Sequence, residues 1–214
     1  MSFFLLAFPA LLSIINPLSG AFIFLGVTKR LSHDVRAHLA RWVAIDSFIV
    51  LNASIYIGAY VLEFFGISLP VLRVAGGLVI AMAAWNLLNA GDEGPDQTMV
   101  DSVNASEASR RAFYPLTMPI TTGPGTISVA VALGTNRPDK VASLAVFLVA
   151  ATLVTAVLSL MIYGLYRNAD RVSQVVGPTG TTIIMRLSAF LLFCIGIQVL
   201  WNGASELIAS VIRP

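Results

Sequence analysis

The chain has 214 residues, of which 57% are hydrophobic and only 11% are charged, and its mean hydropathy is +0.85. A soluble domain carries about 25% charged residues because its surface must be hydrated, so this composition argues against a soluble enzyme or a nucleic-acid-binding protein. The formal net charge of +2 is too small to indicate a polyanionic partner. A single cysteine, Cys194, excludes an intramolecular disulfide and a cysteine-rich metal site. The composition therefore predicts an all-α integral membrane protein.

Six segments are long and apolar enough to cross a bilayer, which requires roughly 20 apolar residues per helix. The predicted transmembrane helices cover residues 1–28, 42–62, 69–90, 112–136, 141–166 and 183–210. The connections between them are short, except for a polar segment at 91–111. The sequence therefore predicts one compact helical bundle without a soluble domain.

The positions of Lys and Arg predict the orientation, because loops on the cytoplasmic side carry more positive charge. With the N-terminus outside, nine basic residues lie on or near the cytoplasmic side and four on or near the outer side. We therefore expect both termini to be periplasmic and the polar segment 91–111 to be cytoplasmic. Its acidic residues count little in this comparison, because the rule concerns basic residues.

The two halves of the chain resemble each other. Each half contains three predicted spans, so the second half enters the membrane from the opposite side, as in transporters with inverted repeats. A shift of 107 residues aligns Pro17 with Pro124 and Arg30 with Arg137. The sequence thus predicts two inverted three-helix repeats and a linker, at residues 1–90, 112–214 and 91–111 respectively.

The first helix of each predicted repeat contains proline near its middle, at Pro17 and at Pro124. Proline lacks an amide hydrogen and moves the preceding residue out of the α region, so the helix kinks or stops there. In hydrocarbon, the freed peptide groups cost several kcal/mol unless protein, water or a ligand satisfies them. A plain kink satisfied by neighbouring helices is one interpretation. A binding site at the bilayer midplane, built from both breaks, is the other, and it is the one we favour.

The chemistry of helix ends indicates the ligand. A helix that begins after a break presents N–H groups to an anion, and one that ends before a break presents carbonyls to a cation. A zwitterion meets both demands, so a small neutral amino acid could be held with few charged side chains. The predicted substrate-binding residues are Asn16, Pro17, Ser19, Gly20, Thr121, Thr122, Gly123, Pro124, Gly125 and Thr126.

Three stretches together resemble the MarC/SnatA family of inner-membrane proteins: Asn-Pro-Leu-Ser-Gly at 16–20, the proline-rich run at 114–127, and Arg-Val-Ala-Gly-Gly at 73–77. The likeness covers nearly the whole chain. It implies six helices in two inverted repeats, a location in the bacterial inner membrane, and transport of small neutral amino acids such as Gly, Ala, Ser or Thr, with proton coupling in some members. The acidic loop at 91–111 departs from the family pattern, and family likeness does not fix the substrate.

Three ionisable residues in or near the predicted spans are candidates for coupling or gating, because such residues are costly in a membrane. Asp46 either forms an ion pair with Arg41 or Arg186, or carries protons or binds an ammonium group. Arg73 and Arg186 occupy related positions in the two halves. Each either extends to the lipid headgroups or locks one side through a partner such as Asp46 or Glu63.

These observations favour a secondary transporter that works by alternating access. An ion gradient supplies the energy, because no nucleotide-binding motif is present. Protons are the simplest coupling ion, Na⁺ bound by carbonyls is the alternative, and export is the working assumption. The competing interpretations are a small-solute channel or facilitator, a non-transporting membrane scaffold, and an intramembrane enzyme, which lacks a visible catalytic constellation. We expect no cofactor, metal or nucleic acid, and the oligomeric state is open.

Overall fold

The computed structural model describes residues 2–28, 31–89, 112–138 and 140–212, and the regular elements in these ranges are all helices. In chain order they are α1 (Ser2–Ile15), α2 (Pro17–Val27), α3 (His33–Phe64), α4 (Leu69–Asn89), η2 (Ala112–Thr121), α6 (Pro124–Gly134), α7 (Val141–Arg167) and α8 (Ala169–Ile212). The predicted linker at 91–111 lies outside the described residues.

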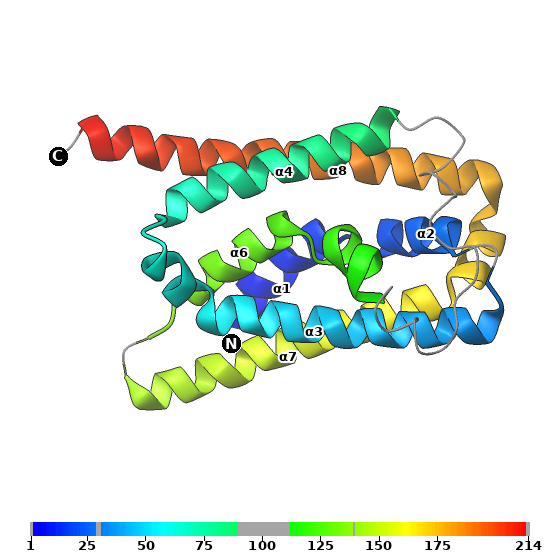
Figure 1. Ribbon diagram of the computed structural model, residues 1–214, viewed down its shortest axis with the longest axis horizontal. Helices are drawn as coiled ribbons and strands as arrows, with labels where there is room; N and C mark the ends of the chain where they lie inside the picture. The colour runs from blue at the N-terminus through cyan, green and yellow to red at the C-terminus, as the bar shows by residue number, and fades with distance from the viewer. Residues whose placement is uncertain (1, 29–30, 90–111, 139, 213–214) are drawn as a thin grey trace.

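The helices form three layers (Figure 1). The long helices α4 and α8 lie side by side at the top of the view, and α3 and α7 pair at the bottom. The shorter helices α1, α2, η2 and α6 occupy the middle layer. The two interrupted segments are therefore enclosed between the two pairs of long helices.

Glycines bring α4 and α8 into close contact. A Cβ atom on Gly77 would lie 2.4 Å from the backbone nitrogen of Leu200, and one on Gly196 would lie 2.6 Å from that of Ala81. In membranes, such small residues let helix backbones approach closely enough for van der Waals packing. Arg73 on α4 and Glu206 on α8 add an ion pair near the end of this contact.

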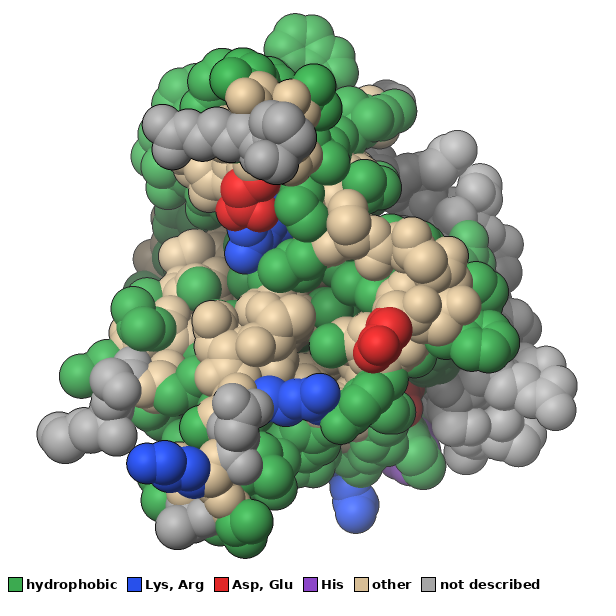
Figure 2. Space-filling model, turned by 90° about the vertical axis from the view of Figure 1, so that its left-hand side faces the viewer, with side chains coloured by type: hydrophobic (Ala, Val, Ile, Leu, Met, Phe, Trp, Pro, Cys, Tyr) green, Lys and Arg blue, Asp and Glu red, His purple; other side chains and the backbone are tan. Residues whose placement is uncertain are grey.

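The lengths and surfaces of the helices fit a membrane protein that crosses the bilayer several times. Large hydrophobic side chains such as Leu6 and Leu160 are about 70% exposed, as lipid contact requires. The end of the bundle seen in Figure 2 carries few charged side chains among apolar ones. Within the described residues, five segments are long and apolar enough to span a membrane: Phe3–Val27, His33–Phe64, Leu69–Asn89, Ser143–Arg167 and Thr179–Ile212.

The predicted span at 112–136 differs most from expectation. It consists of η2, which is wound largely as a π-helix, followed by the short apolar helix α6. Tyr114 and Met118 have extended backbones within η2 (φ −128° and −111°), because each precedes a proline. The described part of the chain thus has five long apolar helical segments plus shorter ones, instead of six long spans.

Two other helices are longer than predicted. Helix α3 begins at His33, because the Ser32 hydroxyl accepts a hydrogen bond from the Val35 N–H at 3.5 Å and caps its first turn. Helix α8 begins at Ala169 and bends at Gly177, where φ is +74°, a value that glycine adopts without steric cost.

Candidate functional site

The break between α1 and α2 consists of one residue. Asn16 adopts a left-handed conformation (φ 43°, ψ 63°), and Pro17 then starts α2. The backbone N–H of Asn16 donates to the Leu12 carbonyl at 2.9 Å, and the Asn16 carbonyl accepts from the Gly20 N–H at 3.0 Å. Its side-chain oxygen accepts from the Ser19 N–H at 3.4 Å. Asparagine is among the few non-glycine residues that tolerate this conformation, so the chain turns here with little loss of backbone hydrogen bonds.

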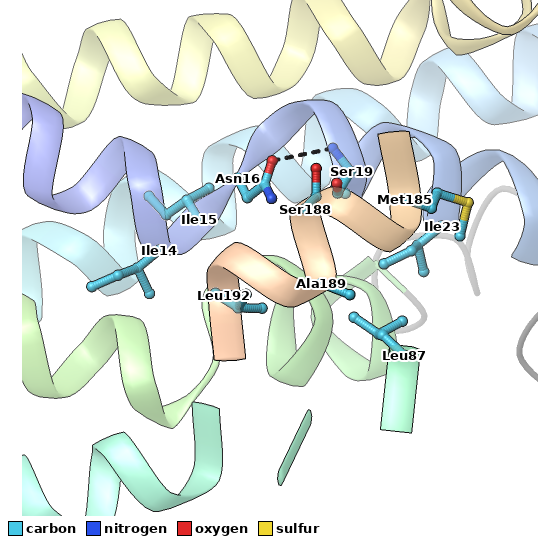
Figure 3. Close-up of a pocket in the computed structure, with 11 residues that line it drawn as sticks. Ile14, Ile15, Asn16, Ser19, Ile23, Leu87, Met185, Ser188, Ala189 and Leu192 are labelled. Carbon is cyan, nitrogen blue, oxygen red and sulfur yellow. Dashed lines mark hydrogen bonds between the residues drawn. The ribbon is translucent and has the colours of Figure 1, made fainter. Parts of the chain in front are cut away.

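A cavity of about 60 Å³ lies against this break. That volume holds a few water molecules or a small solute. Asn16 and Ser19 face it from one side and Ser188 of α8 from the other (Figure 3). The Ser19 hydroxyl is buried and has no hydrogen-bond partner among the described residues. The remaining lining residues are Ile14, Ile15, Gly20, Ile23, Leu87, Met185, Ala189 and Leu192.

The side chains at this break are better placed to bind a ligand than the peptide dipoles that the sequence suggested. The N–H groups of Ser19 and Gly20, in the first turn of α2, already donate to Asn16. The Ser19 hydroxyl faces the cavity and has no hydrogen-bond partner among the described residues. The Asn16 amide and the Ser188 hydroxyl lie close to it (Figure 3).

A second and wider cavity, of about 430 Å³, lies on the other side of the same residues. It is bounded by Pro17 and Leu18 of α2, by α7 and by α8, and it shares Asn16 and Ser188 with the smaller cavity. Leu18 is partly exposed at 36%. Asn16 and Ser188 thus line both cavities.

The second break, between η2 and α6, is built differently. Three threonine hydroxyls donate to carbonyls five residues earlier: Thr117 to Ala112 (2.8 Å), Thr121 to Leu116 (2.8 Å), and Thr122 to Thr117 (3.4 Å). The Thr122 N–H also donates to the Thr117 carbonyl, at 2.8 Å. These threonine hydroxyls of η2 therefore find their acceptors on the backbone of their own segment.

None of the predicted residues between Thr121 and Thr126 lines the cavity at the first break. Gly123 is extended before Pro124, which begins α6. Gly125 packs against α4, where a Cβ atom would lie 2.0 Å from Cγ1 of Ile80. Gly125 is therefore needed for helix packing, and Thr126 is buried in the bundle. Of the ten predicted binding residues, the structure brings Asn16, Ser19 and Gly20 together at this cavity, with Pro17 beside them in the wider one.

Tyr166 of α7 connects the two breaks. Its hydroxyl lies 2.9 Å from the Thr121 hydroxyl and occupies the space beside Gly20, where a Cβ atom would be 2.3 Å away. Its ring stacks on Phe24 at a centroid distance of 4.9 Å, and the whole side chain is buried. The two interruptions therefore lie next to each other in the bundle, on either side of one phenol oxygen.

Comparison with known proteins identifies the family. The model of "MarC family integral membrane protein" matches residues 1–208. The chain belongs to the MarC family. It is 33% identical over 210 residues to the "UPF0056 inner membrane protein MarC" of Escherichia coli O1:K1 / APEC and of strain UTI89, covering 94% of this chain and 93% of each relative. The protein of the same name in strain K12 is 32% identical over the same shares. No solved structure matches the chain.

The predicted coupling and gating residues of this MarC-family chain lie away from the cavity. Asp46 is on α3, where its Oδ2 atom is buried without a hydrogen-bond partner in the described ranges, and no ion pair with Arg41 is present there. Arg73 pairs with Glu206, a residue other than the Asp46 and Glu63 that the sequence suggested as partners for the two arginines. Arg186 is an exposed residue of α8 with an interaction of its own.

Sequence reasoning missed two residues at the site of this MarC-family protein, Ser188 and Tyr166. Ser188 was a small polar residue two positions after Arg186 in an apolar segment, and only the packing of α8 against the first break gives it a role. Tyr166 stands next to Arg167 at the end of a span, a position typical of an interfacial aromatic residue. Its complete burial could be seen only in three dimensions.

Proposed function

We propose that this protein is a secondary transporter of small neutral amino acids in the bacterial inner membrane. The observation that carries the proposal is the polar cavity at the break in the first membrane helix, formed by Asn16, Ser19 and Ser188. A buried hydroxyl without a partner, such as that of Ser19, costs free energy that a bound ligand or water can recover. A site of this kind between apolar helices is suited to a small polar guest.

The lining of the cavity supports the substrate class. None of the described residues that line it is charged, so a ligand with net charge would lack a counter-ion among them. Its apolar walls include Ile23, Met185 and Leu192, and its volume is about 60 Å³, which favours a short side chain. Gly, Ala, Ser and Thr fit these demands, and the hydroxyls and amide at the break offer hydrogen bonds to the ammonium and carboxylate groups.

We propose further that the chain consists of two inverted repeats, residues 1–90 and 112–214, that rock around the broken helices. Helices α2 and α6 support this, because each has 11 residues and begins at a proline, and these prolines are 107 positions apart (124 − 17). The pairing of α3 with α7 and of α4 with α8 also supports it. In this scheme both termini are periplasmic, as the basic residues suggest.

Asp46 is the proposed proton carrier. Its half-buried carboxylate lies in a membrane-spanning helix with one oxygen unpartnered among the residues described, and an ionisable group in such a position is a functional candidate. We expect Asp46→Asn to retain exchange of labelled for unlabelled substrate but to lose accumulation driven by a pH gradient. Wild-type accumulation by this variant would remove Asp46 from the mechanism and assign proton coupling to another group.

A counterflow screen of the standard amino acids in proteoliposomes tests the main proposal. We expect transient accumulation of labelled Gly, Ala, Ser or Thr when the same unlabelled amino acid is inside, whereas a channel would only equilibrate the label. Asn16→Ala should abolish the signal, and Asn136→Ala, which alters an exposed asparagine at the end of α6, should not. Absence of counterflow for every amino acid, or normal counterflow by Asn16→Ala, would contradict the proposal.

A further inference from the structure

A groove separate from the candidate transport site lies between α3 and α7. Its volume is about 540 Å³, and it shares no residue with the two cavities at the first break. Its lining includes two small side chains, Ala44 on α3 and Ala156 on α7, which leave space beside their larger neighbours. The groove is lined by Arg41, Ala44, Ile45, Phe48, Ala156, Ser159, Leu160 and Tyr163.

Most of the groove is apolar, and it lies on the lipid-facing surface of two predicted membrane spans. Ile45 is 36% exposed and Leu160 is 68% exposed, as expected for side chains that contact lipid. A narrow apolar groove along two helices fits an acyl chain better than a compact solute. The shape alone would accept the chain of any lipid, so its polar features must decide which one.

One end of the groove is basic. Arg41 lines it directly, and Arg167 donates a hydrogen bond of 2.7 Å to the hydroxyl of Tyr163, another lining residue. The acidic residue that follows on the chain, Asp170, is already paired with Arg36 at 2.6 Å. Asp170 therefore does not neutralise Arg41 or Arg167, and the end of the groove favours an anionic headgroup.

A polar atom inside the groove also points to a ligand. Ser159 is only 7% exposed, it lines the groove, and its hydroxyl has no hydrogen-bond partner in the described part of the chain. It lies two helical turns deeper than Arg167. A hydroxyl at that depth is placed to donate to an ester carbonyl, which in a phospholipid lies between the phosphate and the acyl chain.

We propose that this groove binds an anionic phospholipid, with its phosphate at Arg41 and Arg167, an ester carbonyl at Ser159 and an acyl chain between α3 and α7. The apolar groove, the basic end and the buried unpartnered hydroxyl are independent features that this one ligand satisfies in the order in which they occur along the helices. The proposal does not depend on the transport activity.

The test is thermal unfolding of the purified full-length protein in a neutral detergent, with phosphatidylglycerol or phosphatidylcholine of identical acyl chains added. We expect phosphatidylglycerol to raise the unfolding midpoint by roughly 2–4 °C more than phosphatidylcholine, the shift that about 1 kcal/mol produces in a chain of this length. Arg41→Gln should remove this difference, and Ser159→Ala should reduce the shift given by both lipids.

Arg137→Gln is the matched control. Arg137 is an exposed arginine like Arg41, with its guanidinium carbon 4.3 Å from the centre of the Tyr60 ring, but it does not line the groove. We expect its response to phosphatidylglycerol to equal that of the wild type. Equal shifts for the two lipids with the wild type, a full difference in Arg41→Gln, or loss of the difference in Arg137→Gln would each overturn the proposal.

Discussion

Both helix breaks contain proline, but they differ in whether the hydroxyl groups beside them have hydrogen-bond partners. At the first break one residue, Asn16, turns the chain, and a buried serine hydroxyl next to it has no partner in the described residues. At the second break three threonine hydroxyls satisfy carbonyls of the π-helix. In this sense the first break is open, with a hydroxyl that lacks a partner in the described residues, and the second is closed, with these three threonine hydroxyls already bonded within the segment.

The position of the hydroxyls relative to proline explains the difference. The threonines precede Pro124, so their side chains can reach back to backbone carbonyls of the π-helix. Ser19 follows Pro17 in the first turn of α2, where the side chain of Asn16 already caps the helix. At these two breaks, the threonines before Pro124 are hydrogen-bonded, whereas the Ser19 hydroxyl after Pro17 has no partner in the described residues.

The largest expected effect comes from filling the space where the two breaks meet. In Gly20→Ala the new Cβ atom would lie 2.3 Å from the Tyr166 hydroxyl, so overpacking should cost about 3 kcal/mol of unfolding free energy and abolish counterflow. Gly26→Ala, on the same helix, has nothing within 4 Å of its new atom and should leave both properties intact. Equal behaviour of the two variants would show that the breaks do not meet at Gly20.

Opening the second break should reduce stability. Thr117→Val removes the hydroxyl that donates to the buried Ala112 carbonyl, and the loss should cost about 2 kcal/mol in unfolding free energy. Thr135→Val removes a similar hydrogen bond at the exposed end of α6 and should cost less than about 0.5 kcal/mol. Thermal or denaturant unfolding in detergent measures both, and an equally small cost would mean that the threonines do not close this break.

The sequence predicted both breaks because proline acts on its own backbone and its immediate neighbours, so Pro17 and Pro124 could be read without tertiary information. It also indicated the apolar spans and the family. The π-helix, the bend at Gly177 and the partners of Ser19 depend on packing between distant segments. For this reason the sequence assigned equal binding roles to both breaks, whereas the structure brings Ser188 of α8 to the first.

The link between the breaks should give a smaller effect. Tyr166→Phe removes its hydrogen bond with Thr121 and should cost about 1 kcal/mol of stability. If the Tyr166 and Thr121 hydroxyls act as one unit, adding Thr121→Val to Tyr166→Phe should lower the unfolding free energy by less than Thr121→Val does alone. A double-mutant cycle of unfolding free energies measures this difference. Strictly additive costs would mean that Tyr166 does not couple the two segments.

The smallest effect on stability is expected at the open break, together with a clear effect on binding. Ser19→Ala removes a hydroxyl that has no partner in the described residues, so the unfolding free energy should stay constant or rise. The same variant should weaken substrate binding about tenfold, the equivalent of about 1.4 kcal/mol for one lost hydrogen bond, seen as a higher KM in counterflow. If Ser19→Ala lowered the unfolding free energy and left KM unchanged, the Ser19 hydroxyl would have a structural role and not a binding role.

Protection of a reporter cysteine in the cavity tests the central claim most directly. The only cysteine, Cys194, can be replaced by serine, and Ser188→Cys then places one thiol at the wall that faces Asn16 and Ser19. We predict that the amino acid this variant transports slows methanethiosulfonate labelling at concentrations near its KM, whereas Ser205→Cys, outside the cavity, labels at a constant rate. An unchanged labelling rate at Ser188→Cys while the same preparation transports that amino acid would contradict a binding site at the first break.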